Sequence, residues 1–155
     1  MLGPTAHVDT FTRDNLPPPE EWPDFLLEGF DYPDRLNAAV ELTDAMVAKG
    51  FGDRTALIGN GRRRTYKELS DWTNRLAHAL VENYGVKPGN RILIRSANNP
   101  AMVACWLAAT KVGAVVVNTM PMLRAGELTK IVDKAEIGLA LCDTRLTDEM
   151  IACAK

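Results

Sequence analysis

The side chains that could carry out chemistry in this chain are three cysteines, two histidines and a run of three arginines. Cys105, Cys142 and Cys153 form no Cys-x-x-Cys pair, and no histidine stands at metal-ligand spacing from them. We therefore predict no metal site, and reduced, buried thiols as in a cytoplasmic protein. His78 has no acid, thiol or second histidine beside it at catalytic spacing, and His7 lies in a segment without periodicity. Both histidines are predicted to be solvated or at the edge of the core, not catalytic.

The arginines at positions 62–64 leave two interpretations open. Their charge could bind phosphate, or it could protect an exposed edge strand from pairing with another sheet, which is the interpretation we favour. Phosphate-binding loops are rich in glycine, and neither Gly-x-Gly-x-x-Gly nor Gly-x-x-x-x-Gly-Lys occurs in the sequence. We therefore predict no phosphate-binding loop of either type.

The composition excludes several classes of partner. The 155 residues are 46% hydrophobic and 25% charged, with a formal net charge of -2, which is typical of one globular domain. This charge creates no net field to attract nucleic acid or an anionic membrane, so neither is expected as a partner. The longest apolar stretch, residues 101–117, is interrupted by Lys111 and Gly113 and falls short of the roughly 20 residues that span a bilayer.

Residues 1–33 are predicted to form an extended, proline-containing arm. Residues 16–23 hold four prolines, which fix φ and remove hydrogen-bond donors. A proline-recognition motif is one interpretation of this stretch. We favour an arm whose apolar side chains are held on the surface of the domain. These side chains are Trp22, Phe25, Leu26 and Phe30.

A helix and a hairpin are predicted next, at the start of a domain spanning residues 34–155. Asp34 can cap a helix that ends at Gly50 and Gly52. Its apolar positions recur at three- and four-residue steps, at Leu36, Val40, Thr43 and Val47. Residues 55–65 read as a hairpin, because Asn60-Gly61 supplies the positive φ angles that a tight turn needs.

A capping box marks the start of the next helix. Thr65 stands three residues before Glu68, so that each side chain can satisfy a backbone amide of the other. Gly85 ends this helix. Its apolar stripe consists of Leu69, Trp72, Leu76, Leu80 and Tyr84.

Strands and helices then alternate three times. Apolar strands are predicted at residues 91–95, 114–117 and 139–142. Asn98 or Asn99 can cap the first intervening helix, with Pro100 at its first position. The inward positions of that helix are predicted to be Met102, Val103, Trp106, Leu107 and Thr110. A second helix follows near Leu128, and Thr144 or Thr147 begins a last one. The predicted fold is α/β: a parallel sheet of three βα units, preceded by the hairpin and helix.

Five short motifs follow one another in this region. They are Thr65-Tyr66-Lys67-Glu68-Leu69, Gly85-Val86-Lys87-Pro88-Gly89-Asn90-Arg91-Ile92, Asn98-Asn99-Pro100, Val112-Gly113-Ala114 and Pro121-Met122-Leu123-Arg124-Ala125-Gly126-Glu127-Leu128. Their order resembles the amino-terminal part of the acyl-adenylate-forming enzymes, the family of acyl-CoA synthetases and aryl-CoA ligases. The resemblance covers residues 34–145, and Asn90 replaces an aspartate that is usual in the family.

The resemblance implies an enzyme that joins a carboxylate to AMP, using ATP and Mg2+, and then transfers the acyl group to CoA. The chain lacks the family's Thr-Ser-Gly-Thr-Thr-Gly phosphate loop, its later acidic residues and the lysine of its small carboxy-terminal domain. We therefore expect an amino-terminal fragment, truncated at its carboxyl end, that contains no catalytic residue, is inactive and binds neither ATP nor CoA by itself. The resemblance leaves open whether the longer enzyme forms a homodimer.

The resemblance also implies one site within the chain. The family's loop after the Ala-Gly-Ala strand lies near the tunnel through which CoA reaches the adenylate. Its counterpart here is Asn118, Thr119, Met120, Pro121 and Met122. The alternative is that Met120 and Met122 fill gaps in the core and that Asn118 caps a strand end.

The long acidic leader and the Asn-Thr-Met-Pro-Met segment look most like ligases acting on benzoate or 2-aminobenzoate, so an aromatic carboxylic acid is the expected substrate. A self-sufficient α/β module of the flavodoxin or receiver type, which would bind a ligand or a partner without catalysis, is the main alternative. A receiver should carry clustered acids after its first strand, and the predicted strands are followed by Ser96-Ala97-Asn98 and Asn118-Thr119.

Overall fold

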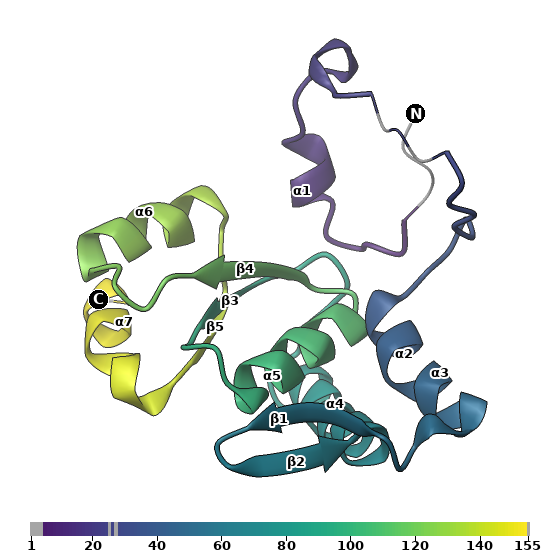
Figure 1. Cartoon of the computed structure of the whole chain (residues 1–155). Helices are drawn as coiled ribbons and strands as arrows, with labels where there is room; N and C mark the ends of the chain where they lie inside the picture. Colours follow the sequence, from purple (N-terminus) through teal and green to yellow (C-terminus); the bar gives the residue numbers. More distant parts are fainter. Residues whose placement is uncertain (1–4, 25, 27, 155) are drawn as a thin grey trace.

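A three-stranded parallel sheet forms the centre of the molecule in the computed structural model, which describes residues 5–24, 26 and 28–154 (Figure 1). Strands β3 (Arg91–Arg95), β4 (Val115–Thr119) and β5 (Leu139–Cys142) are arranged in the order β4-β3-β5. Arg91 pairs with Val115, and Ile92 pairs with Leu139 on the other side. β3 is the central strand, and all five of its residues are buried.

Helices connect these strands as the alternating pattern predicted. α5 (Pro100–Lys111) links β3 to β4, and α6 (Ala125–Lys134) links β4 to β5. A short 3-10 helix, η3 (Thr144–Leu146), and α7 (Thr147–Cys153) follow β5. Because the two crossovers run in opposite directions along the sheet, right-handed connections place α5 and α6 on opposite faces. The three predicted βα units are therefore confirmed.

The predicted hairpin and the capped helix are confirmed as well. β1 (Thr55–Gly59) pairs antiparallel with β2 (Arg62–Thr65), and φ is 52° at Asn60 and 70° at Gly61. In α4 (Tyr66–Glu82) the Thr65 hydroxyl accepts from the Glu68 amide at 3.1 Å. The Glu68 carboxylate accepts from the Thr65 amide at 2.9 Å, which completes the capping box.

The core lies between the sheet and the pair α4 and α5. Ala77 and Leu80 of α4 meet Ala108 and Ala109 of α5 over Ile92. Of the predicted inward face of α5, Leu107 is buried, and Val103 and Trp106 are partly buried and pack against the core; the other fully buried positions on this helix are alanines. Small side chains allow α5 to approach α4 and the sheet closely, which bulky ones would prevent.

Two further predictions about side chains are wrong. Tyr84 does not continue the buried stripe of α4, since it lies beyond the end of the helix and is 64% exposed. Asp34 does not cap the first helix of the domain, because Asn37 accepts hydrogen bonds from the amides of Ala39 and Val40. The Asn37 amide group also donates to the Lys111 carbonyl at 3.0 Å. This hydrogen bond fixes Asn37 against the end of α5.

The first helix is also shorter than predicted. α2 (Ala38–Leu42) is followed by α3 (Asp44–Met46) and by a π-helical turn, η2 (Val47–Phe51), in which Gly50 has φ of 82°. Of the predicted stripe Thr43 is fully buried and Leu36 is half exposed. The chain therefore bends here where a single straight helix was expected.

The amino-terminal arm contains two short helices, α1 (Phe11–Asp14) and η1 (Pro19–Glu21), and forms a separate loop above the sheet (Figure 1). Leu26 and Phe30 are 84% and 64% exposed, so the prediction that they hold the arm on the domain is wrong. Phe25 lies outside the described residues, and the indole of Trp22 donates to the Pro17 carbonyl within the arm.

Asp9 attaches the arm to the domain instead. Its carboxylate pairs with the buried guanidinium of Arg91 and accepts from the Asn90 side chain at 2.9 Å. The ring of Phe11 lies against the same guanidinium, 4.4 Å from its centre. These bonds lower the pKa of Asp9, the largest cause being its hydrogen bond from the Phe11 amide.

Candidate functional site

The segment Asn118–Met122 leaves the sheet at the carboxyl end of β4. Asn118 and Thr119 are the last two residues of the strand, opposite Ile94 and Arg95 of β3. Ligand sites of parallel α/β sheets gather at this edge, outside the carboxyl ends of the strands. The predicted site residues therefore stand at the edge where such folds bind ligands.

The two methionines of the segment point away from the core. Met120 is 63% exposed and Met122 is 81% exposed, whereas Thr119 is buried. The alternative that these methionines fill gaps in the core is therefore wrong for this chain. The Thr119 hydroxyl is instead the inward-facing group, and it donates to the Ile94 carbonyl at 3.5 Å.

Arg95 was not predicted as a site residue, yet it organises this edge. Its side chain is 1% exposed and donates four hydrogen bonds, all to backbone carbonyls. Nη1 reaches Met120 at 3.1 Å, and Nη2 reaches Pro121 at 2.9 Å and Leu123 at 2.8 Å. Nε reaches Leu146 at 3.3 Å. The sequence shows only an arginine at each end of a short apolar strand, a pattern that looks like exposed strand ends.

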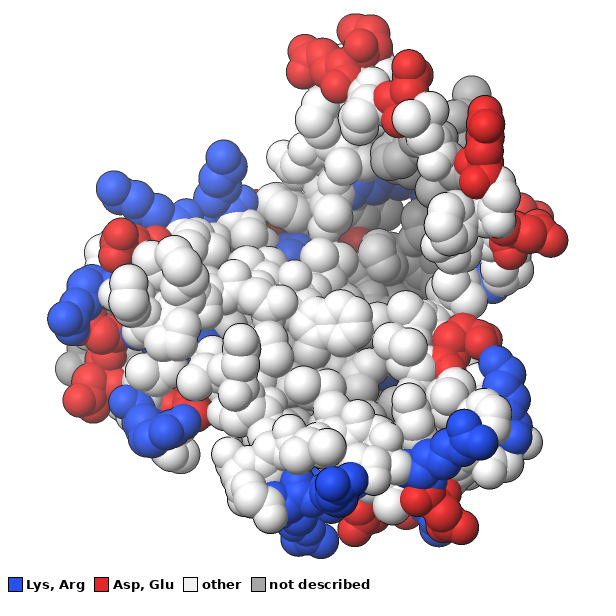
Figure 2. Space-filling model, viewed as in Figure 1, with Lys and Arg blue, Asp and Glu red and all other residues white. Residues whose placement is uncertain are grey.

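A hollow of about 470 Å³ lies beside the segment, between it and the start of α7. Two of the charged side chains that line it pair with each other. Arg124 contacts Glu149 at 2.8 Å, and the second oxygen of Glu149 accepts from the Ala125 amide. The hydrogen bond from Arg124 is the main reason that the pKa of Glu149 is lowered. Figure 2 shows that positive and negative side chains alternate on this side of the molecule, over α6 and α7.

Asp143 ends the strand β5 at the same edge. It accepts two side-chain hydrogen bonds and a backbone hydrogen bond from Arg145, which together lower its pKa to about 2. Asn99, which caps α5 by accepting from the Met102 amide at 2.9 Å, adds a weaker contact. Asp143 is therefore held ionised as a cap of η3.

The cysteines are free and partly buried, and burial raises the pKa values of Cys105 and Cys142. Both thiols are therefore protonated at neutral pH and are poor nucleophiles. His78 is exposed on α4, and an acid does lie beside it, because Nδ1 is 3.3 Å from a carboxylate oxygen of Glu82. The prediction that no acid accompanies this histidine is wrong, since positions four apart face each other on a helix.

The three arginines of β2 lie on the exposed hairpin. Arg64 stacks on the Trp72 ring at 4.5 Å from its centre, and Arg62 pairs with Glu68 at 3.5 Å. Two of the three charges are therefore engaged by the chain's own side chains, which agrees with the edge-strand interpretation.

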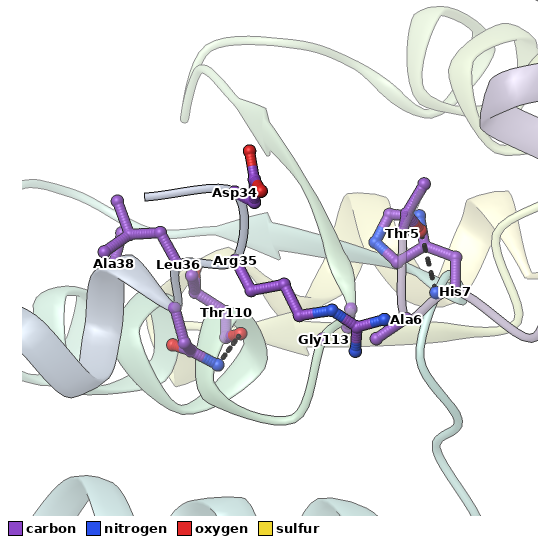
Figure 3. Close-up of a pocket in the computed structure, with 11 residues that line it drawn as sticks. Thr5, Ala6, His7, Asp34, Arg35, Leu36, Ala38, Thr110 and Gly113 are labelled. Carbon is purple, nitrogen blue, oxygen red and sulfur yellow. Dashed lines mark hydrogen bonds between the residues drawn. The ribbon is translucent and has the colours of Figure 1, made fainter. Parts of the chain in front are cut away.

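A second hollow, of about 580 Å³, lies at the opposite end of the sheet between the arm and the start of β4 (Figure 3). The side chain of Arg35 crosses it toward Ala6 and Gly113. His7 borders it, and its backbone amide donates to the Thr5 hydroxyl at 2.8 Å. Among the described residues that line it, Asp34 and His7 lie apart from each other and form no pair of acid and base (Figure 3).

The described residues offer neither a metal-binding cluster nor a membrane-spanning helix. They contain no group of three or more His, Cys, Asp or Glu side chains that could hold a metal ion. None of their helices combines the length and the apolar character that crossing a membrane requires.

Comparison with known proteins identifies the family. Residues 45–155 match the sequence profile of the AMP-binding enzyme family, and the chain belongs to it. It is 32% identical over 108 residues to a 3-hydroxybenzoate–CoA ligase of Aromatoleum sp. (strain CIB), an alignment that covers 70% of this chain and 20% of that one. It is 39% identical over 82 residues to a 3-hydroxybenzoate–CoA/4-hydroxybenzoate–CoA ligase of Thauera aromatica, covering 53% and 16%. The chain thus spans about a fifth of the length of these relatives.

Solved structures show the same fold. A benzoate CoA ligase from Burkholderia xenovorans LB400 superposes with a TM-score of 0.72 at 23% identity, over 77% of this chain and 24% of that one. The anthranilate CoA ligase AuaEII superposes with a TM-score of 0.69 at 19% identity, over 75% and 22%. The predicted fold, part of the large amino-terminal domain of acyl-adenylate-forming enzymes, is confirmed.

Proposed function

We propose that this chain is the amino-terminal part of an AMP-forming aryl-acid–CoA ligase that acts on benzoate or 2-aminobenzoate. The observation that carries the proposal is the family match over residues 45–155. The names of the relatives support an aromatic acid, because they include hydroxybenzoate, benzoate and anthranilate ligases. Relatives named for crotonobetaine/carnitine and 3-oxocholest-4-en-26-oate widen the range of acids that an experiment must compare.

The proposed reaction has two steps. The carboxylate attacks the α-phosphorus of ATP and releases pyrophosphate, and the thiol of CoA then attacks the acyl carbon and releases AMP. ATP and CoA are substrates, and Mg2+ would neutralise the phosphates when bound. Because the described residues contain neither a metal-binding cluster nor a phosphate loop, we assign these tasks to further residues of a longer protein.

Within that enzyme we propose that Asn118, Thr119, Met120, Pro121 and Met122 border the path of CoA. Three features support this role: the position at the carboxyl end of β4, the exposure of both methionines, and the hydrogen bond from Arg95 that fixes the backbone carbonyl of Met120. Met120 and Met122 would offer flexible apolar surface to the pantetheine arm of CoA.

The first experiment measures the mass of the natural gene product and its acid-dependent exchange of pyrophosphate into ATP. We expect a polypeptide several times longer than 155 residues. Exchange should be faster with benzoate or 2-aminobenzoate than with crotonobetaine or a long-chain acid. The 155-residue chain alone should show no exchange. A natural product of about this size with no exchange activity would favour the alternative of a binding module.

The second experiment places a charge in the proposed path. Met120→Glu in the full-length enzyme should raise KM for CoA, or slow thioester formation, while pyrophosphate exchange is preserved. Tyr84→Glu is the matched control, because Tyr84 is 64% exposed, close to the 63% of Met120, and lies near the amino end of β3. Equal losses in both half-reactions for Met120→Glu would contradict a role in the path of CoA.

A further inference from the structure

The guanidinium of Arg95 is an unusual buried charge. It is 1% exposed and makes no ion pair with the described residues, and its hydrogen-bond partners are four backbone carbonyls from two different segments. A buried cation is costly unless its donors are satisfied, so this arrangement fixes the carbonyls as firmly as it fixes the arginine. Arg91, at the other end of the same strand, is also buried but pairs with the carboxylate of Asp9.

The bonds of Arg95 determine which way the loop after β4 faces. Three of the four carbonyls belong to Met120, Pro121 and Leu123, and all three must point inward to reach the guanidinium. With these carbonyls turned inward, the side chains of Met120 and Met122 point into solvent, as their exposure shows. The fourth bond, to Leu146, ties the same group to the start of α7 across the hollow.

We propose that Arg95 is the positioning residue that holds the loop 120–123 in the shape through which CoA reaches the acyl-adenylate. This inference rests on the proposed function of the segment Asn118–Met122. Arg95 lies beneath the loop and acts through its backbone, so it touches neither CoA nor the reacting atoms. A displacement of about 1 Å in a substrate-positioning loop can cost up to about 100-fold in rate. Loss of the hydrogen bonds from Arg95 should therefore change the rate of the CoA step measurably.

Lysine cannot replace this arginine fully. The guanidinium is a planar fork that donates from three nitrogens in fixed directions, whereas an ammonium donates from a single point. An ammonium at this position can satisfy some of the carbonyls of Met120, Pro121, Leu123 and Leu146, but it cannot span all of them. Arg95→Lys should therefore retain part of the loop's order, and Arg95→Met, which keeps the volume and removes every donor, should retain least.

The test uses the full-length ligase with four variants: Arg95→Lys, Arg95→Met, Arg91→Met and Met120→Glu. We expect Arg95→Met to raise KM for CoA, or slow thioester formation, by about 10-fold or more, with pyrophosphate exchange changed less than about two-fold. Arg95→Lys should fall between Arg95→Met and the unchanged enzyme. Arg91→Met is the control for loss of a buried arginine in the same strand, and it should leave KM for CoA unchanged.

A structural measurement accompanies the kinetics. Arg124 follows the loop and is 79% exposed, so trypsin should cut after it faster in Arg95→Met than in Arg91→Met when both are folded. If Arg95→Met does not fold, the same kinetic and proteolysis measurements on Arg95→Lys replace it.

Equal losses in both half-reactions, or the same effect on CoA from Arg91→Met, would overturn the inference. If Met120→Glu itself leaves the CoA step unchanged, the proposed role of the segment fails first; if only the Arg95 variants leave it unchanged, the positioning role alone fails.

Discussion

Replacing Gly89 with alanine tests whether the amino-terminal arm docks on the domain as the structure shows. Gly89 has φ of 92°, and a Cβ atom built on it would lie 2.1 Å from the carbonyl oxygen of Asp9. Ordinary contact requires about 3.4 Å or more, so the arm would have to move by more than about 1 Å. Since Asp9 also holds Asn90 and Arg91, this movement would release the arm from the end of β3.

Gly85→Ala is the matched control. Gly85 has φ of 64°, but a Cβ atom added to it would meet nothing within 4 Å. Both substitutions therefore introduce a left-handed non-glycine residue, which costs about 1–2 kcal/mol, and only Gly89→Ala displaces the arm. The arm donates two hydrogen bonds of 3.0 Å, from the amides of Val8 and Asp9, to the Pro88 carbonyl. At about 1 kcal/mol for each bond, Gly89→Ala should lower the free energy of unfolding by at least about 2 kcal/mol more than Gly85→Ala, because the bonds of Asp9 to Asn90 and Arg91 are lost as well.

Urea unfolding measures this difference. With a slope of about 2 kcal/mol per molar urea, the midpoint of Gly89→Ala should lie at least about 1 M below that of Gly85→Ala. Removing residues 1–15 from both variants should bring the two midpoints together, because the collision partner is then gone. Equal midpoints in the chain that retains the arm would refute the docking of Asp9 over Gly89.

Two further predictions concern hydrogen bonds that begin helices. Thr65→Ala should lower the free energy of unfolding by about 1 kcal/mol by removing the cap of α4, and Thr65→Ser should keep it; equal urea midpoints for the two variants would contradict the capping role. Asp143 has a pKa of about 2 against an ordinary 3.8, so its ionised form stabilises the fold above about pH 4 and this contribution is lost as the pH falls toward 2. Arg145→Ala should raise the pKa of Asp143 in an NMR titration, and Asn99→Ala should raise it less; an unchanged value in Arg145→Ala would show that this ion pair is not formed in solution.

Turns and helix starts were predictable because one or two residues dictate each of them. Asn60-Gly61 adopts the positive φ angles of its turn, and Thr65 with Glu68 forms the expected box. Pro100 begins α5 behind a capping asparagine, as its missing amide allows. These interactions act within four residues of each other, so the surrounding fold cannot easily override them.

The choice between competing candidates was harder to predict. Asp34 and Asn37 are both good caps, and the structure selects Asn37 because its amide also reaches the end of α5. Hydrophobicity ranks Trp106 above an alanine, yet Trp106 is only partly buried while alanines of α5 are fully buried, because the helix lies close to α4. Both outcomes depend on tertiary contacts that no local pattern contains.

The least predictable features were the contacts of the two arginines of β3. Arg91 pairs with Asp9, 82 residues away, and Arg95 bonds to carbonyls 25 to 51 residues away. Backbone carbonyls have no residue type, so a sequence cannot indicate that an arginine will bind them. Charged residues at the ends of an apolar strand look like exposed ends, and the structure shows instead that both are buried.

The two buried arginines have different partners, so the two ends of β3 differ in what they hold in place. At the amino end, the charge of Arg91 is matched by a carboxylate from the arm, so the contact joins one segment of the chain to another. At the carboxyl end, Arg95 is matched by the carbonyls of a loop whose side chains it leaves exposed. Because an exposed, preorganised surface is what a substrate path requires, the contrast itself favours the carboxyl end as the functional edge. The strand between them is fully buried.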